Sequence, residues 1–342
     1  MPTPVRVSDL CPNPPPGAGR LVTGPGGLSC AQTVRGEADA PDYEGTRNME
    51  TTEARPARLR VGVVGAGRVG SALGNALARA GHKVVAASAV SEASVARVEG
   101  RLPGARILEP AQVAEASDLV LLTVPDDALP DLVEGLAATG TDLRGKIIMH
   151  ASGAHGYGIL APATIAGALP LALHPAMTFT GRDEDIDRLA NCAFGVTAPE
   201  QLRPIAEALV VEMGAEPVWI AEDKRTLYHA ALAGGANHLV TLVADSASLL
   251  SAAGVPEPGR MLAPMLSAAL DNALRLGIHG LSGPVLRGDA GTVAGHVEQL
   301  RETAPESVAS YVELARLTAD RAINAGMLKP EDAARLLDVL RR

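Results

Sequence analysis

The stretch RVGVVGAGRVGSALGNALARAG, residues 60–81, decides how the rest of the chain is interpreted. Residues 61–64 have the apolar character of a buried strand, and residues 71–80 have the small, mostly apolar character of a helix packed on a sheet. Between them, residues 65–70 read GAGRVG. A strand, a GxGxxG turn and a helix, in this order, form the fingerprint of a dinucleotide-binding fold. We therefore expect a dinucleotide site here; the alternative is a turn of the same fold that has lost its cofactor.

Each glycine of this turn has a physical task. Gly65 permits the tight turn, Gly67 leaves out a Cβ so that a pyrophosphate can approach the backbone, and Gly70 lets the helix pack close to the strand. The N–H groups at the start of the helix have no partner within it and lie at the positive end of its dipole, where phosphates bind. The candidate cofactor-binding residues of the turn are Gly65, Ala66, Gly67, Arg68, Val69 and Gly70.

Composition argues against several classes of protein. The net charge of −9 and an aromatic content of 2% are unfavourable for binding nucleic acid. No apolar run is long enough to span a membrane, and the N-terminus lacks the pattern of a secretory signal. Cys11, Cys30 and Cys192 show neither pairing nor the spacing of metal ligands. We therefore expect a cytoplasmic protein without a metal site, a nucleic-acid partner or a membrane partner.

The 342 residues divide into three regions. Residues 1–57 lack a hydrophobic period and contain Pro- and Gly-rich runs, which predicts a disordered tail, with a docking arm as the alternative. Residues 58–221 alternate between apolar runs and helical patterns, which predicts an α/β fold with a doubly wound, mostly parallel Rossmann sheet. Residues 222–342 show helical periodicity alone. We expect this region to be an all-helical domain for substrate binding and homodimerisation.

The same patterns predict individual elements. A loop that contains His174 and Pro175 is expected between the fifth strand and the next. The expected strands are residues 59–64, 83–88, 105–108, 119–124, 146–150, 193–197 and 217–220. The expected helices of the last region are residues 227–252, 258–277, 293–303, 307–325 and one that begins near 329.

The second expected strand favours NADP over NAD. In NAD-binding folds, an acidic side chain near the end of this strand binds the ribose 2′-hydroxyl. Here residues 86–89 read AASA, and the first acid is Glu92. Ser88 can accept a 2′-phosphate without charge repulsion, and Arg68 can reach that phosphate or stack on the adenine. The alternatives are a strand-end cap for Ser88 and a solvated turn residue for Arg68.

Residues at the carboxyl ends of the strands are candidates for ligand binding, because ligands of doubly wound sheets lie there. Val124 and Pro125 would line the nicotinamide ribose. His150 ends the fifth expected strand and is a candidate proton donor, and Ser152 is a candidate hydrogen-bond partner of a substrate carbonyl. The alternatives are a strand-end histidine whose ring is already hydrogen-bonded and a serine that forms a turn.

Two further residues are candidates for binding a substrate carboxylate. His174 lies in the expected loop, where a plain loop histidine is the alternative. Arg287 lies in SGPVLRGD, residues 282–289, and a guanidinium binds a carboxylate through two hydrogen bonds. The alternative for Arg287 is a structural ion pair with Asp289.

The helical region opens with polar side chains suited to acid–base chemistry. Lys224 and Tyr228 are four residues apart and share one helix face. His229 and Asn237 are eight apart and share another face, about 80° from each other. Lys224, His229 and Asn237 are of the types that hydride transfer to a carbonyl or imine requires. The two faces are expected to meet in one pocket only if Gly234–Gly235 bends the helix; for Asn237 the alternative is a helix–helix contact.

Six segments together resemble a known family. They are GAGRVG (65–70), LLTVPD (121–126), HASG (150–153), HPAMTF (174–179), KRTLYHAALAGGANHLVTL (224–242) and SGPVLRGD (282–289). In this order they resemble proteins that join a Rossmann-like oxidoreductase domain to the domain of unknown function 2520. The resemblance extends from about residue 58 to the C-terminus, and it implies an NADP-dependent oxidoreductase without naming a substrate.

More distantly, the chain is similar to pyrroline-5-carboxylate reductases, 3-hydroxyacid dehydrogenases, ketopantoate reductases and prephenate dehydrogenases. The His-Pro pair at 174–175 resembles the prephenate group. The hydroxyacid and ketopantoate enzymes use a lysine with an asparagine four residues later. Here Tyr228 stands four residues after Lys224, and the nearest asparagine is Asn237. Their mechanism therefore does not transfer residue by residue.

We expect an NADP-dependent oxidoreductase that transfers hydride to or from a small carboxylate-bearing carbonyl or imine, for example the 2-oxo acid ketopantoate. The alternatives are a non-catalytic NADP sensor or regulatory protein, a prephenate-dehydrogenase-like activity, and a structural dimer with a vestigial turn. The candidate catalytic residues are Lys224, His229, Asn237, Ser152 and His150. The candidate substrate-binding residues are His174, Tyr228 and Arg287.

Overall fold

The computed structural model describes residues 58–341 of the chain. The predicted disordered tail, residues 1–57, lies outside the described residues, and with it Cys11 and Cys30. The described residues belong to one unit of the chain, which spans Pro56–Arg342.

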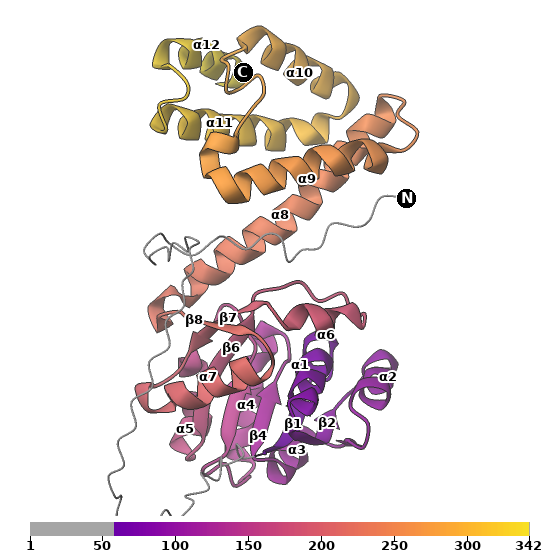
Figure 1. The fold of residues 1–342 in the computed structure, drawn as a ribbon, viewed down its shortest axis with the longest axis vertical. Coiled ribbons are helices and arrows are strands. Elements are labelled where there is room, and N and C mark those ends of the chain that lie inside the picture. Colours follow the sequence, from indigo (N-terminus) through magenta and orange to yellow (C-terminus); the bar gives the residue numbers. More distant parts are fainter. Residues whose placement is uncertain (1–57, 342) are drawn as a thin grey trace, which may run out of the picture. The chain divides into compact units, whose positions relative to one another are not determined.

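A single eight-stranded sheet in the order β3-β2-β1-β4-β5-β6-β7-β8 forms the first part of this unit (Figure 1). Neighbouring strands are parallel except for the antiparallel pair β6 and β7. The strands are β1 (Arg60–Val64), β2 (Lys83–Ser88), β3 (Arg106–Ile107), β4 (Leu119–Leu122), β5 (Ile147–His150), β6 (Leu169–Pro175), β7 (Ala193–Thr197) and β8 (Glu216–Trp219). The prediction of a doubly wound, mostly parallel sheet is confirmed. The strand order reverses between β1 and β4, which is where ligands bind in such sheets.

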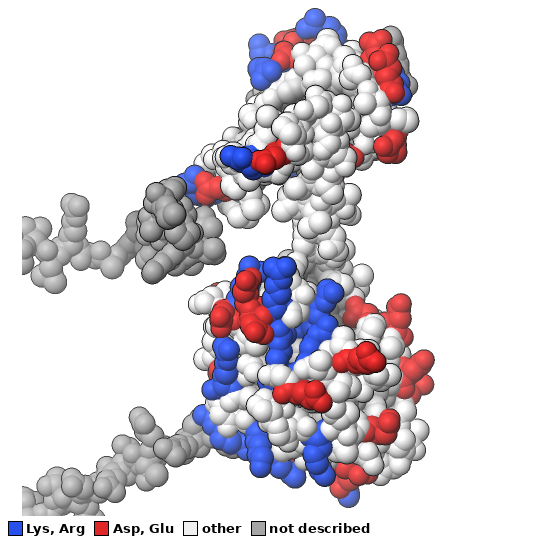
Figure 2. Space-filling model, turned by 90° about the vertical axis from the view of Figure 1, so that its right-hand side faces the viewer, with Lys and Arg blue, Asp and Glu red and all other residues white. Residues whose placement is uncertain are grey.

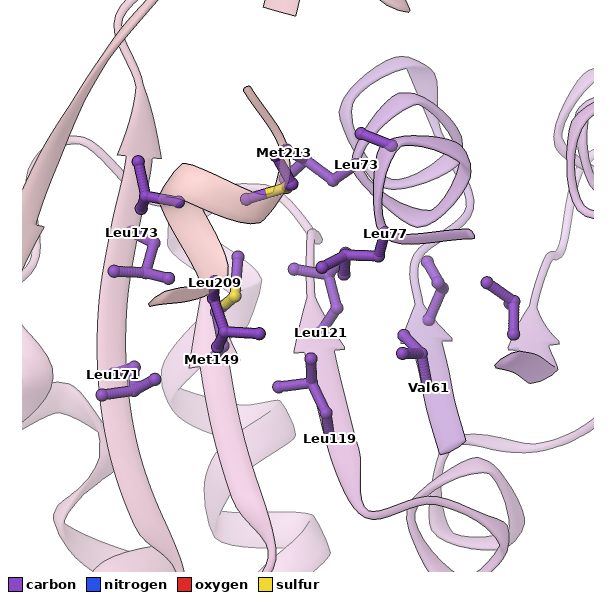
Figure 3. Close-up of a cluster of buried hydrophobic side chains, with 14 of the residues drawn as sticks. Val61, Leu73, Leu77, Leu119, Leu121, Met149, Leu171, Leu173, Leu209 and Met213 are labelled. Atoms are coloured by element: carbon purple, nitrogen blue, oxygen red, sulfur yellow. The ribbon is translucent and has the colours of Figure 1, made fainter. Parts of the chain in front are cut away.

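Helices cover both faces of the sheet because side chains of both faces are apolar. In β4, Leu119 and Leu121 belong to one buried cluster, whereas Val120 and Leu122 belong to another. Leu73 packs in the first cluster, which Figure 3 shows. The helices of this part are α1 (Arg68–Arg79), α2 (Glu92–Arg101), α3 (Pro110–Ala116), α4 (Leu129–Ala138), α5 (Ala161–Ile165), α6 (Glu184–Leu189) and α7 (Arg203–Glu212). Residues of α1 and α7 enter the first cluster, and residues of α3, α4 and α5 enter the second.

After β8 the described chain contains helices and no further strand. Residues of α10, α11 and α12 form a third buried cluster. The principal helices are α8 (Arg225–Ala252), α9 (Pro258–Leu276), α10 (Ala290–Thr303), α11 (Val308–Asn324) and α12 (Pro330–Arg341). The prediction of a helical C-terminal region is confirmed. Within the described residues, no helix has both the length and the apolar character needed to cross a membrane.

The main departure from the predicted elements is β6. A loop is expected around His174 and Pro175, but Leu169–Pro175 forms a strand between β5 and β7. Pro170 and Pro175 obscure the strand pattern, because proline donates no hydrogen bond to a neighbouring strand. The consequence is important for the site, since His174 is held on the sheet and is paired in register with Gly195 of β7.

Candidate active site

The glycine-rich turn between β1 and α1 has the geometry of a phosphate-binding turn. Gly65 has a φ of +88°, which favours glycine. A Cβ on Gly70 would lie 2.5 Å from the carbonyl oxygen of Gly65, so only glycine allows this close packing. A Cβ on Gly67 would have only one neighbour within reach, at 4.0 Å. The backbone of Gly67 therefore faces open space at the N-terminus of α1, where neither a capping side chain nor an acidic residue competes for the N–H groups.

Hydrogen bonds to Ser88 at the end of β2 and from Thr123, the residue after β4, hold this turn in place. The N–H of Gly65 donates to the hydroxyl of Ser88 at 3.0 Å, and the N–H of Ala66 donates to the carbonyl of Ser88 at 2.9 Å. The hydroxyl of Thr123 donates to the carbonyl of Gly65 at 2.7 Å. Ser88 thus supports the turn, as the strand-end alternative requires, and its hydroxyl hydrogen is still available to a 2′-phosphate.

The remaining predicted cofactor residues lie around the same turn. Val124, which follows β4, is next to Gly65, because a Cβ on that glycine would lie 3.1 Å from Val124 Cγ1. Pro125 follows directly. Arg68 is exposed, and its side chain runs beside Gly181, whose added Cβ would lie 3.2 Å from Arg68 Cγ. The structure therefore brings these predicted residues together at the carboxyl ends of β1 and β4.

His150, at the end of β5, is fully buried, and both of its ring nitrogens are hydrogen-bonded to backbone. The N–H of Ser152 donates to Nδ1 at 3.2 Å, so Nε2 carries the hydrogen and donates to the carbonyl of Gly156 at 2.9 Å. Burial lowers the pKa of His150 to about 4. This is the arrangement of a satisfied strand-end histidine, with no ring nitrogen left for a substrate. The Ser152 hydroxyl accepts a hydrogen bond from the N–H of His155 at 3.2 Å and retains its own hydrogen.

Three aromatic side chains meet where β6 faces the first turns of α8. The Nδ1 atom of His174 lies 2.9 Å from the hydroxyl of Tyr228. The rings of His174 and His229 make an edge contact, with 5.8 Å between their centroids. Gly153, the last residue of the HASG segment, allows this contact, because a Cβ there would lie 2.6 Å from His229 Cδ2 and 2.9 Å from His174 Nε2. Three motifs that are distant in the sequence therefore form one cluster.

His174, His229 and Asn237 line a single pocket of about 330 Å³. The other lining residues come from the segment after β6 and from α8, and except for Thr178 they are apolar: Ala176, Met177, Leu232, Ala233 and Ala236. The expected bend at Gly234–Gly235 would be needed only to bring the helix face of Lys224 into the same pocket. No such bend is present, because α8 runs without a break through these glycines. An 80° difference in direction lies within the width of one helix face, so His229 and Asn237 share the pocket.

Arg225, which the sequence did not single out, is the buried charge beside this pocket. Its side chain is among the largest that are fully buried, with 1% of the residue exposed. The guanidinium donates to the carbonyl of His155 at 2.9 Å, to that of Gly195 at 3.0 Å and to that of Ser152. Among the described residues it has no carboxylate partner in an ion pair. The first turn of α8 is therefore tied to β7 and to the segment after β5 by a cation that keeps its charge.

The spacing of residues in the sequence is compatible with an inward-facing Arg225, but it does not distinguish Arg225 from Lys224. Arg225 and Tyr228 are three residues apart and share a helix face, as Lys224 and Tyr228 also do. The guanidinium lies over the Tyr228 ring at 5.4 Å from its centroid. Which of the two neighbouring cations turns inward depends on carbonyl groups that lie far away in the sequence.

The other two predicted cations lie outside the pocket lining. Lys224 is exposed and pairs with Asp223 at 2.7 Å. Arg287 pairs with Asp289 at 2.8 Å, which is the structural alternative considered for it. No Lys or Arg of the described chain lines the pocket that contains His174 and His229.

Two family models match successive parts of the chain. A Rossmann-like domain matches residues 45–175, and the domain of unknown function DUF2520 matches residues 192–318. The predicted resemblance to proteins that combine these two domains is confirmed. The second match begins before β7, so this domain includes the last two strands of the sheet. Among curated proteins, none is similar enough to this chain to count as a match.

Solved structures of several oxidoreductases share this fold. A candidate NADP oxidoreductase from Bacteroides fragilis is 19% identical with a TM-score of 0.66, over 77% of this chain and 98% of that one. A reductive aminase from Aspergillus terreus, in complex with NADPH and ethyl levulinate, is 19% identical with a TM-score of 0.58, over 82% and 99%. An imine reductase from Pseudomonas sp. is 20% identical with a TM-score of 0.58, over 83% and 100%. At these identities the likeness concerns the fold.

Proposed function

We propose that this protein is an NADP-dependent oxidoreductase that transfers hydride to or from a small carbonyl or imine compound. The observation that carries the proposal is the position of two features on one sheet edge. The glycine-rich turn lies at the carboxyl ends of β1 and β4, and the histidine-lined pocket lies beyond β5 and β6, which are parallel to them. A dinucleotide bound along this edge would bring its nicotinamide toward the pocket.

The residues at the turn fit NADP. The open face of Gly67 and the uncapped N-terminus of α1 suit a pyrophosphate, and β2 ends in Ser88 without an acidic residue. Val124 and Pro125 would line the nicotinamide ribose. When bound, the cofactor supplies or accepts the hydride. The complexes named for similar structures, which include NADPH and NADP+, support this choice.

Two pocket residues would complete the reaction. Reduction of a carbonyl or imine adds a hydride to carbon and a proton to oxygen or nitrogen. His229 is the proton donor that faces the pocket, and Asn237 supplies an amide that can orient the substrate. Of the other predicted donors, Lys224 is exposed and ion-paired, and both ring nitrogens of His150 are hydrogen-bonded to backbone.

The residues that line the pocket limit the classes of substrate that fit it. Its lining contains no Lys or Arg of the described chain, so a carboxylate there, as in ketopantoate, would depend on His174 or on Arg287 reaching in from elsewhere. An uncharged ketone or imine requires neither. The similar imine reductases and reductive aminases favour testing such compounds beside the 2-oxo acids.

Binding and turnover test the proposal separately. Titration of NADPH with the protein, followed by the nicotinamide fluorescence, measures binding. NADPH oxidation is then measured with 2-oxo acids, cyclic imines and ketone–amine pairs, and NADP+ reduction with prephenate. Turnover of any of these compounds supports an enzyme. Tight NADPH binding without turnover of the whole panel favours a sensor, and the absence of binding would contradict the proposal altogether.

We also propose that the protein is a homodimer through α8 and α9. Of the 28 residues of α8, only Arg225 is buried, and residues 226–252 contain one Asp, Glu, Lys or Arg, namely Asp245. Uncharged surface accordingly dominates much of this region (Figure 2). Large exposed apolar side chains on the two helices are Leu227, Leu232, Leu239, Val240, Leu242, Met261, Met265, Leu270, Leu274 and Leu276. So many large exposed apolar side chains on two helices are typical of a protein interface.

Light scattering on a sizing column tests the dimer. Val240→Glu, at a residue that is 69% exposed on α8, should yield a monomer. The reason is that the free energy of burying an unpaired carboxylate exceeds the free energy gained by dimerisation. Ile165→Glu is the matched control, since Ile165 on α5 is 89% exposed but lies outside this surface. A monomeric wild-type protein would refute the dimer.

A further inference from the structure

Tyr228 lies behind His174, away from the pocket lining. Its hydroxyl lies 2.9 Å from His174 Nδ1, and the two rings meet edge to face with 5.6 Å between centroids. The phenol packs against the backbone of β7, because a Cβ on Gly195 would lie 2.6 Å from Tyr228 Cζ. Tyr228 does not line the pocket, whereas His174 does. The pair is therefore arranged in series, with the imidazole between the phenol and the pocket.

The surroundings of Tyr228 favour the phenol as the donor in this hydrogen bond. Among the described residues, His174 Nδ1 is the only hydrogen-bond partner of the phenol oxygen. The single hydrogen of the hydroxyl is then free to be donated to His174 Nδ1. In a neutral imidazole one ring nitrogen accepts and the other carries the hydrogen. A hydroxyl that donates to Nδ1 places the hydrogen of His174 on Nε2.

The groups that face His174 keep the ring neutral at pH 7. Burial lowers its pKa to about 4, and the charge of Arg225 and the ring of His229 on α8 act in the same direction. His150 on β5 adds to this effect, and Asp126, after β4, opposes it. Tyr228, the remaining titratable neighbour, has a raised pKa because of burial and stays protonated. A fixed cation and an apolar pocket thus disfavour an imidazolium.

The Nε2 atom of His174 is the part of the ring that remains available. It lies over Gly153, whose added Cβ would be 2.9 Å away, on the side where His229 approaches. Within the described residues no hydrogen bond to this nitrogen is present, while Nδ1 is used by Tyr228. A neutral N–H therefore points to the region that His174 and His229 share.

We propose that His174 is a neutral hydrogen-bond donor to the reacting oxygen or nitrogen of the substrate, with Tyr228 selecting the ring nitrogen that carries the hydrogen and Arg225 keeping the ring uncharged. This role rests on the proposed oxidoreductase function. As hydride reaches the carbon, the electron pair of the double bond moves to the oxygen or nitrogen, and His229 supplies the proton to that atom. His174 keeps its own hydrogen throughout and stabilises the developing negative charge.

Spectroscopy tests the proton position without any substrate or cofactor. Long-range 1H–15N correlation spectra of protein labelled at histidine distinguish a hydrogen on Nε2 from one on Nδ1, and an imidazolium from both. We expect His174, assigned by its loss in His174→Gln, to be neutral with Nε2 protonated from pH 5.5 to 8. Tyr228→Phe should increase the form protonated on Nδ1. An imidazolium at pH 7, or a wild-type ring protonated on Nδ1, would overturn the proposal.

The helical region provides a matched control. His296 and Tyr311 form the same kind of pair, with Nδ1 and the hydroxyl 2.8 Å apart and ring centroids 5.9 Å apart. Tyr311→Phe should change the signals of His296 and leave those of His174 unchanged. A change at His174 in this variant would show that the effect of Tyr228→Phe is not local, and it would refute the assigned role of Tyr228.

Kinetics with any substrate found in the panel tests the chemical role. His174→Leu removes the donor and should lower kcat by about 100-fold with a smaller change in KM. His174→Gln keeps a neutral N–H donor at a similar reach but cannot become a cation or an acid, so it should restore much of this loss. Equal loss in both variants would refute a neutral donor. Because the spectroscopic result stands without turnover, failure of this proposal and failure of the oxidoreductase function are distinguishable.

Discussion

Replacing Gly67 with alanine separates the needs of the fold from those of a bound pyrophosphate. Gly67 has φ −74° and ψ −158°, which alanine adopts without strain. An added Cβ would have its nearest neighbour at 4.0 Å, which is ordinary van der Waals contact. The variant should therefore be as stable as the wild type or more stable by about 0.4–1 kcal/mol, because alanine restricts the unfolded chain.

The same methyl group should weaken cofactor binding, because it occupies the space in which a pyrophosphate approaches the backbone. Forcing an extra methyl group into a filled site costs about 1–3 kcal/mol. At 1.4 kcal/mol for each factor of ten, the Kd for NADPH should rise roughly 5- to 140-fold.

Two measurements on the same preparation check this prediction. Thermal unfolding without ligand should give an unchanged or slightly higher Tm, and fluorescence titration should give the increased Kd. Gly100→Ala on α2 is the control, since a Cβ there has no neighbour within 4 Å and no role at the turn. If Gly67→Ala binds NADPH as the wild type does, the turn is not the phosphate site and the reasoning is refuted.

Three further predictions follow from the site. Gly153→Ala should destabilise the protein by about 1–3 kcal/mol, because the added Cβ would overlap His229. In a thermal scan this is a decrease in Tm of roughly 2–4 °C for each kcal/mol. The control Gly135→Ala, whose added Cβ has no neighbour within 4 Å, should leave Tm without such a decrease. His229→Gln should lower kcat by about 100-fold or more without changing the Kd for NADPH, whereas an equal loss in Lys224→Ala would contradict the assignment of the proton donor. Because the pKa of His150 is about 4 in the folded protein and about 6.5 when unfolded, the unfolded state binds the extra proton between these values, so stability should fall as pH decreases from 6.5 to 4, by up to about 1.4 kcal/mol per pH unit. Urea unfolding at several pH values should show that the free energy of unfolding depends less steeply on pH in His150→Gln than in the wild type. An unchanged dependence on pH would contradict the buried neutral ring.

Local features of the site were predictable because they depend on neighbouring residues. The order of strand, glycine turn and helix at residues 60–81 requires no knowledge of distant segments, and the structure reproduces it. The absence of an acid after Ser88 is likewise a local observation. β6 could not be recognised in this way, because its two prolines hide a strand whose stability comes from β5 and β7 on either side.

The roles of individual polar residues depended on distant backbone groups. Lys224 and Arg225 are adjacent and equally basic, yet only Arg225 meets three carbonyl groups, on residues 152, 155 and 195. From the sequence, His150 has the features of a catalytic histidine. In the structure its Nε2 donates a hydrogen bond to the carbonyl of Gly156 and is therefore not available to a substrate. Such pairings arise only when the sheet and α8 are assembled.

The attachment of α8 at its first turn also has a mechanical consequence. A helix of 28 residues is about 42 Å long, and its buried anchor, Arg225, is its first residue. A rigid rod that pivots by 5° about one end moves its other end by about 4 Å over that length. The cluster of His174, Tyr228 and His229 lies at the pivot. A sub-ångström adjustment of these rings would therefore become a displacement of several ångströms at the far end of α8, which carries part of the surface of the proposed dimer.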